Sequence, residues 1–145
     1  MWGRVGEDDG CFMSALGNVE RVGGVLEHPA SSSAWCHPLA GTDRNPLPVP
    51  PRSGGWVRSL FRPGWACHVE QGWYGHPAPK ATWLYYVGPP PPPLRWGDAP
   101  LAMVDSCPSV GRTRGRTVEV LTKLERRETP PAFAELLLSL ANARE

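Results

Sequence analysis

The sequence predicts an α/β domain with few strands, two flanking helices and long Pro/Gly-rich loops. The 18 Pro and 16 Gly residues make 34 of 145, about 23%, which is roughly twice their average usage and leaves room only for short regular elements. Residues 81–87 combine β-branched and aromatic side chains between turn residues, which is typical of a buried strand. Apolar residues recur at helical spacing near both ends of the chain, which predicts the two helices.

The first helix is predicted to follow residues 8–10, where Asp-Asp-Gly can cap its beginning. Phe12, Leu16 and Val19 repeat at helical spacing and define its apolar face. Gly23, followed by a second glycine, is expected to end it. The helix should therefore pack one face on the core.

A very short strand is predicted at Val25 and Leu26. Pro29 has no backbone N–H and disfavours the helical region for the residue before it, so the strand should stop there. Glu27 and His28 would then lie at its C-terminal tip. In open α/β sheets, ligands bind at that edge.

The middle of the chain is predicted to be mostly irregular. A helical turn is expected at 31–35, a loop or insertion at 36–55, and a strand at 65–70. The five prolines at 89–93 predict polyproline II, either as a stiff linker or as a docking site for a Pro-binding domain. They open a Pro-rich and basic connecting segment over 89–117.

The C-terminal helix is predicted within 129–143, with Thr129 at the N-cap and Pro130 as its first residue. Phe133 begins an apolar stripe that the leucines of the next two turns continue, so the helix should pack on the core. With no internal repeat, residues 1–145 are interpreted as one domain or part of one.

Charge gives no general reason for binding nucleic acid or membranes, because the net charge is only +1. Between Arg112 and Arg127, six basic residues face two acidic ones, a local excess of four that fits either a solvated surface or a phosphate-binding arm. Neither a signal peptide nor an apolar run of about 20 residues is apparent. A cytoplasmic protein with reduced cysteines is therefore expected.

The cysteines and histidines give two further candidates. The pairs at 36–37 and 67–68 could form a zinc site, but adjacent residues on a strand point to opposite faces, so buried thiols with incidental histidines are the favoured interpretation. Cys11 lies near a predicted helix N-terminus, where its thiol could be reactive. Its neighbour Phe12 favours a buried structural thiol instead.

A polar loop precedes the best predicted strand. Between residues 71 and 82 it carries chemically versatile groups seldom gathered for packing alone: Gln71, Tyr74, His76, Lys80 and Thr82. Because this loop and Glu27 both adjoin strands, the two polar segments are predicted to converge on one pocket. A buried Glu27 would need a cation such as Lys80.

Three segments, in this order, resemble motifs of the DNA cytosine carbon-5 methyltransferases. Residues 24–29 (GVLEHP) are similar to the Glu-Asn-Val segment of motif VI. Residues 74–88 resemble motif VIII, a Tyr-Gly-x-Pro-Gln turn followed by basic residues and an apolar strand ending in Gly, with Ala78 in place of the Gln. Residues 129–135 (TPPAFAE) resemble the start of motif X. Related phage and prophage proteins are more similar still, since residues 75–82 match their Gly-(His or Asp)-Pro-x-x-Lys-x-Thr pattern position by position.

The resemblance implies a Rossmann-like methyltransferase fold that acts on DNA with S-adenosylmethionine as donor. In that chemistry a Cys thiolate attacks carbon 6 of a flipped cytosine, and a Glu holds nitrogen 3. By resemblance Glu27 is that Glu, and Lys80 stands where the family has an Arg. These two are the catalytic candidates, and the substrate-binding candidates on the same segments are His28, Tyr74, His76 and Thr82.

The family's glycine-rich donor loop and its Pro-Cys nucleophile would precede these motifs, and neither occurs in this sequence. The fold is therefore expected to be incomplete, as the C-terminal portion of a truncated reading frame or half of a split enzyme that is inactive alone. No residue is assigned to the donor. The alternative is a non-enzymatic phage or prophage interaction module that binds protein or nucleic acid.

Overall fold

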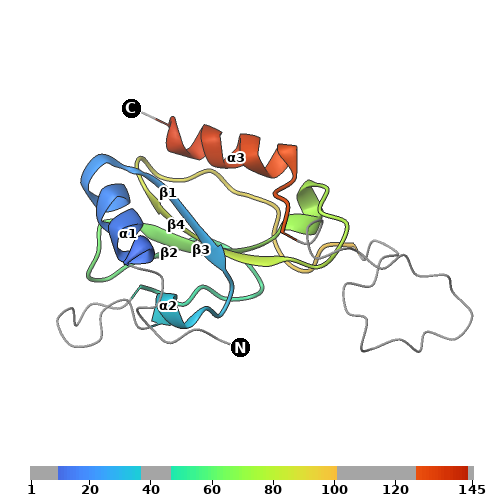
Figure 1. The fold of residues 1–145 in the computed structure, drawn as a ribbon, viewed down its shortest axis with the longest axis horizontal. Helices are drawn as coiled ribbons and strands as arrows, with labels where there is room; N and C mark the ends of the chain where they lie inside the picture. The colour runs from blue at the N-terminus through green and yellow to red at the C-terminus, as the bar shows by residue number, and fades with distance from the viewer. Residues whose placement is uncertain (1–9, 37–46, 101–126, 144–145) are drawn as a thin grey trace, which may run out of the picture.

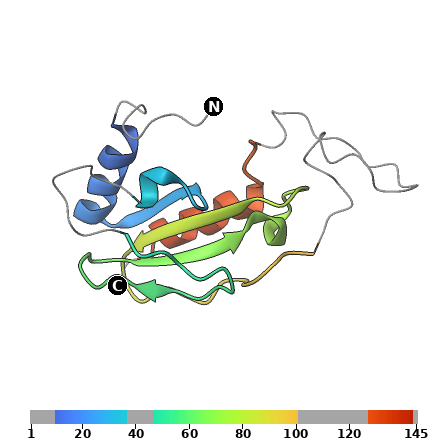
Figure 2. The same ribbon diagram turned by 90° about the horizontal axis from the view of Figure 1, so that it is seen from below.

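The computed structural model describes residues 10–36, 47–100 and 127–143. These residues form one four-stranded sheet flanked by helices (Figure 1). In chain order the elements are α1 (Cys11–Val22), β1 (Gly24–Pro29), α2 (Ser33–Cys36), β2 (Val57–Arg58), β3 (Trp65–Glu70), the 3₁₀ turn η1 (Gln71–Tyr74), β4 (Ala81–Val87) and α3 (Pro131–Ala141). Helix α3 covers one face of the sheet, and α1 and α2 lie on the other (Figures 1 and 2).

The sheet confirms the α/β class but does not establish a Rossmann-like fold. Its strand order is β1-β4-β3-β2, and every neighbouring pair is antiparallel, which is not typical of that fold. Because β1 and β3 both pair antiparallel with β4, they run parallel to each other with the reversed β4 between them. Their C-terminal ends therefore lie at the same edge of the sheet.

The alternation of side chains along β4 divides the core into two layers. Trp83 and Tyr85 point toward α1 and α2, where they join Phe12, Leu16, Trp35 and Leu47. Leu84 and Tyr86 point toward α3, where they join Cys67, Val69, Phe133 and Leu140. Since both faces of β4 are covered, its run of apolar residues is continuous rather than alternating.

The predicted strands at 65–70 and 81–87 are confirmed, whereas β1 is longer than predicted. It continues through Pro29, which lies opposite Thr82. Pro29 is the last residue of β1, so the prediction that the strand ends at this proline is confirmed, and the ladder can include it because β1 is an edge strand. A proline there leaves no hydrogen bond of the ladder unmade on the open side.

The predicted first helix is confirmed, with its beginning set by the backbone rather than by a capping side chain. Gly10 adopts a left-handed conformation (φ 76°) at the N-cap, and as a glycine it has no side chain with which to cap the helix. Cys11 is exposed, so the expectation of a buried thiol is wrong. It lies one residue before Phe12 and therefore about 100° around the helix from the buried face.

The C-terminal helix is also confirmed, but it begins one residue later than predicted. Pro130 is the N-cap, with φ −57° and ψ 141°, and its carbonyl oxygen accepts the first intrahelical hydrogen bonds. The residue before a proline is pushed out of the helical region, so Pro131 compels Pro130 to stay extended. Pro131 is then the first helical residue, a position that needs no N–H donor.

The irregular segments predicted for the middle of the chain are present where the structure describes them, and Trp56 contacts one of them. The helical turn predicted near 31–35 appears as α2, and residues 47–55 form no helix or strand, as expected of the loop at 36–55. The indole N–H of Trp56 donates to the carbonyl oxygen of Pro92 (2.8 Å), so the Pro run contacts an aromatic group of its own chain. Residues 101–117 of the connecting segment and the basic residues before Arg127 lie outside the described residues.

Candidate functional site

Glu27 lies where β1 meets the beginning of β4. It pairs with Leu84 across the two strands and so projects from the face that α3 covers. Thr82 projects from the same face of β4 and offers its hydroxyl to the Glu27 carboxylate. The residue as a whole is exposed, so a ligand can reach it.

Three influences act on the pKa of Glu27. Desolvation of the carboxyl is the largest and raises the pKa above its ordinary value. The positive charge of Lys80 and the hydrogen bond with Thr82 lower the pKa, but they do not cancel the effect of desolvation. Glu27 therefore keeps its proton to a higher pH than an ordinary glutamate.

Lys80 joins this site to the beginning of α3. Its amine donates to the carbonyl oxygens of Arg127 (3.3 Å) and Glu128 (3.0 Å), which precede the helix. Its influence on Glu27 is that of a nearby positive charge. Lys80 thus acts on the carboxyl while its own position is set by two backbone acceptors.

Replacing Lys80 with Met is expected to raise the pKa of Glu27, because the substitution removes the positive charge that lowers it. Carbon-13 NMR of the Glu27 side-chain carboxyl would follow this titration. Lys80→Arg, which keeps the charge, is the matched control and should leave the pKa close to that of the wild type. If the pKa of Glu27 were unchanged in Lys80→Met, the charge of Lys80 would not act on the Glu27 carboxyl.

Thr82 links the exposed Glu27 to a buried amide. The side-chain amide of Gln71 donates to the Thr82 hydroxyl oxygen (2.9 Å), and both side chains are at most 1% exposed. Because that oxygen accepts from Gln71, its own proton is free to point at the Glu27 carboxylate. The chain of hydrogen bonds fixes the direction of the Thr82 hydroxyl.

The other predicted substrate-binding residues lie apart from Glu27. His28 is on the opposite face of β1, where its ring lies 4.9 Å from that of Phe12. The ring of Tyr74 packs 5.5 Å from Phe133 of α3, and its hydroxyl accepts a hydrogen bond from the backbone N–H of Arg95 (3.4 Å). Both residues have packing roles in this arrangement.

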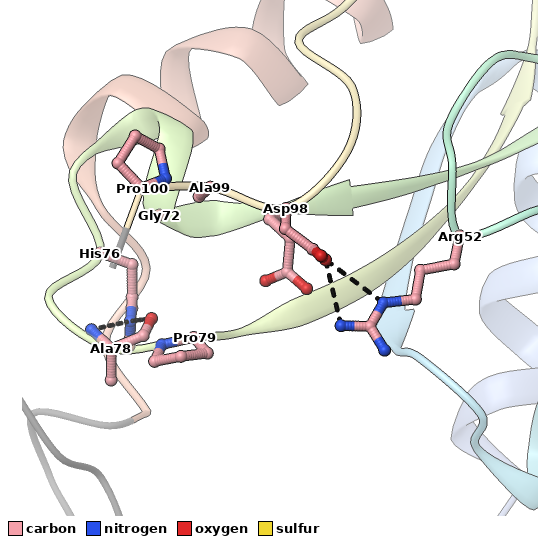
Figure 3. A pocket seen from close by; sticks show the side chains of 9 residues that line it. Arg52, Gly72, His76, Ala78, Pro79, Asp98, Ala99 and Pro100 are labelled. Carbon is pink, nitrogen blue, oxygen red and sulfur yellow. Dashed lines mark hydrogen bonds and ion pairs between the residues drawn. The ribbon is translucent and has the colours of Figure 1, made fainter. Parts of the chain in front are cut away.

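His76 lines a cavity of about 280 Å³ at the C-terminal end of β3 (Figure 3). The cavity is bounded by the loop after η1, by residues 98–100 and by Arg52. Glu70 also lines it, and as whole residues Glu70 and His76 are only 7% and 4% exposed. At its rim the Arg52 guanidinium pairs with the Asp98 carboxylate (3.0 Å).

The buried carboxylate of Glu70 has a neighbour on its own strand. His68 Nε2 lies 3.7 Å from Glu70 Oε1. The indole N–H of Trp83 donates to His68 Nδ1 (3.1 Å), which leaves the proton of a neutral imidazole on Nε2, facing Glu70. One oxygen of Glu70 therefore has a polar neighbour, and its other oxygen faces no hydrogen-bond partner among the described residues.

Sequence reasoning identified His76 but not Glu70, Arg52 or Asp98. The only signal for Glu70 was a charged residue at the end of a strand otherwise suited to burial. Arg52 and Asp98 are 46 residues apart, and nothing in their local sequence predicts their contact. Their convergence depends on how the loops fold back over β3.

Metal ligation and membrane insertion find no support in the described ranges. Cys67 and His68 project from opposite faces of β3, and burial raises the pKa of the Cys67 thiol far above its ordinary range. No group of three or more metal-ligating side chains forms within the described residues. No helix in this part of the chain is long and apolar enough to cross a membrane.

Comparisons of the chain with protein-family models, with curated protein sequences and with solved structures find no match.

Proposed function

We propose that this chain is the C-terminal part of a DNA cytosine methyltransferase-like protein of phage or prophage type, in which Glu27 holds the target base. The observation that carries the proposal is the grouping of Glu27, Thr82 and Lys80. These residues come from two segments that resemble separate motifs of the family. Burial raises the pKa of the Glu27 carboxyl, Lys80 and Thr82 moderate that rise, and the residue stays open to a ligand.

The chemistry of Glu27 suits cytosine. A carboxyl that keeps its proton can donate a hydrogen bond to N3 of cytosine, which has a lone pair there. Thymine carries an N–H at the same position and would repel this donor. The raised pKa of Glu27 thus favours the protonation state that distinguishes the two pyrimidines.

The directions of the strands do not support a doubly wound sheet, so the methyltransferase-like assignment depends on the motifs. β1 and β3 are parallel, and β4 lies between them in the reverse direction. β2 also runs opposite to β3, so two of the four strands are reversed, whereas a doubly wound sheet typically carries at most an antiparallel strand at its edge. The finer assignment, an incomplete Rossmann-like methyltransferase fold, therefore remains part of the proposal.

The described residues do not fit the methyl donor. None of their turns is a glycine-rich connection that leads from a strand into a helix of eight or more residues, the arrangement that binds such cofactors. In the proposed protein S-adenosylmethionine and the cysteine nucleophile would be held by residues outside this part. The role of the chain is to bind and orient the base.

A binding experiment with three forms of the chain tests this role. The probe is a fluorescent oligo-dT strand with one central dC, compared with oligo-dT alone by anisotropy. Wild type should prefer the dC strand, and Glu27→Ala should lose the preference, a change of about three- to tenfold for one hydrogen bond. Glu135→Gln, an exposed change on α3, is the control.

Glu27→Gln separates proton donation from charge. Its amide N–H can donate to N3 at any pH, so the preference for dC should persist and lose its pH dependence. In wild type the preference should fall as pH rises through the pKa of Glu27, because the ionised carboxylate cannot donate. Equal binding of both strands by wild type would contradict the proposal.

A further inference from the structure

The cavity beside Glu70 is lined by polar groups that play no part in the proposed binding of a base at Glu27. It lies at the end of β3, on the face of the sheet opposite to Glu27, and is lined by two buried polar side chains. Glu70 Oε2 and His76 Nε2 both lack a hydrogen-bond partner among the described residues. Native proteins seldom leave such atoms unpaired in the interior, because each costs about 1 to 3 kcal/mol.

His76 presents an acceptor to this cavity. Its Nδ1 lies 2.7 Å from the carbonyl oxygen of Ala78, a distance at which two lone pairs would repel. The backbone nitrogen of Ala78 also lies 3.1 Å from Nδ1, a contact that would need a lone pair there, but the shorter contact to the carbonyl oxygen sets the tautomer. Nδ1 then carries the proton and donates it to the Ala78 oxygen, and the dashed line in Figure 3 marks this contact. In the neutral imidazole, Nε2 then keeps its lone pair and can only accept.

Glu70 gives the cavity its charge. The lining groups are one cation, Arg52, and two carboxylates, Glu70 and Asp98, so the formal sum is +1 − 2 = −1. Arg52 and Asp98 pair with each other and are 75% and 73% exposed, which leaves Glu70 as the buried excess charge. His68, at 3.7 Å from the other oxygen, does not reach Oε2.

We propose that this cavity binds a small primary amine in its ammonium form, with N–H groups donating to Glu70 Oε2 and His76 Nε2. An ammonium carries three donors and no acceptor, which suits a site made of a carboxylate oxygen and an imidazole lone pair. It also supplies the positive charge that a buried carboxylate requires.

The walls fit a short carbon chain. Gly72, Ala78, Pro79, Ala99 and Pro100 contribute small or apolar surfaces around the two polar atoms. Gly72 has no space for a larger residue, since a Cβ there would lie 2.9 Å from that of Ala99. The absence of a side chain at Gly72 therefore lets residues 98–100 pack directly against η1, where they form part of the cavity wall. A cavity of about 280 Å³ is at the small end of ligand pockets.

Isothermal titration in phosphate buffer tests the proposal with n-propylammonium as the probe, and with n-propanol and propionate as neutral and anionic matches. Propylammonium should bind, and the other two should not. Glu70→Gln, which keeps the shape but removes the charge, should weaken binding by about tenfold or more. Glu135→Gln, exposed on α3, should leave it unchanged.

A second variant covers the case in which Glu70→Gln does not fold. Ala99→Leu fills the cavity from a partly exposed loop and should abolish binding while the circular dichroism spectrum stays that of wild type. A capped lysine, Nα-acetyl-lysine N-methylamide, is the last probe. Tighter binding than propylammonium would identify the occupant as a lysine side chain, and weaker binding as a free amine.

The proposal would be overturned if n-propanol bound as tightly as propylammonium, if no probe bound, or if a folded Glu70→Gln or Ala99→Leu kept wild-type affinity. These results do not depend on oligonucleotide binding at Glu27, so the two sites can succeed or fail separately.

Discussion

Truncating Phe133 to alanine is expected to lower the free energy of unfolding by about 3 to 5 kcal/mol, the usual cost of removing a buried phenylalanine ring. The Phe133 side chain is fully buried and packs against Tyr74 of η1. With Leu140, two turns further along α3, it anchors the helix to the face formed by Leu84 and Tyr86. Urea unfolding followed by circular dichroism would measure the change.

Leu138→Ala on the same helix is the matched control. Its side chain is 61% exposed, so the loss should stay below about 1 kcal/mol. Similar losses in the two variants would mean that α3 does not pack on the sheet through Phe133. Because Lys80 bonds to the backbone just before α3, Phe133→Ala should also alter the titration of Glu27.

Trp35→Ala is expected to cost a similar amount, about 3 to 5 kcal/mol, on the opposite face of the sheet. Trp35 is fully buried, its ring packs 5.5 Å from that of Trp83, and its indole N–H donates to the carbonyl oxygen of Pro48 (3.0 Å). The truncation removes the ring contact, opens a cavity and leaves the Pro48 carbonyl without this donor. Urea unfolding again measures the loss.

Trp35→Phe keeps one ring in the core but removes the indole donor and part of the buried ring volume. The expected cost is therefore smaller than for alanine, about 1 to 3 kcal/mol. If alanine and phenylalanine destabilised the protein equally, the hydrogen bond to Pro48 would dominate over the packing. If neither did, Trp35 would not belong to the core.

The fold could be predicted from the sequence where a local pattern decides the structure. The apolar run of β4 and the stripe beginning at Phe133 are such patterns, and both elements appear at the predicted places. The end of β1 at Pro29 could be predicted from the proline, whereas the position of β1 at the sheet edge could not, because it depends on how the strands pair. The order of the strands is likewise a property of the whole sheet.

The candidate sites likewise contain some residues that the local sequence identifies and others that only the tertiary structure brings together. Glu27 and Lys80 were chosen from motifs, and the pairing of β1 with β4 brings them within electrostatic reach. His28 was chosen as a neighbour of Glu27, yet adjacent residues on a strand face opposite ways. Glu70 and His76 meet only because η1 turns the chain back after β3, and neither residue type predicts that turn.

The most direct test of the central claim, that Glu27 holds the target base, is the pKa of its carboxyl measured by carbon-13 NMR with and without DNA. In the free protein the pKa should lie above the ordinary value of 4.5. Saturating oligo-dT with a central dC should raise it further, because N3 binds only the protonated form, whereas oligo-dT alone should not. A pKa at or below 4.5, or one that responds equally to both strands, would contradict the account.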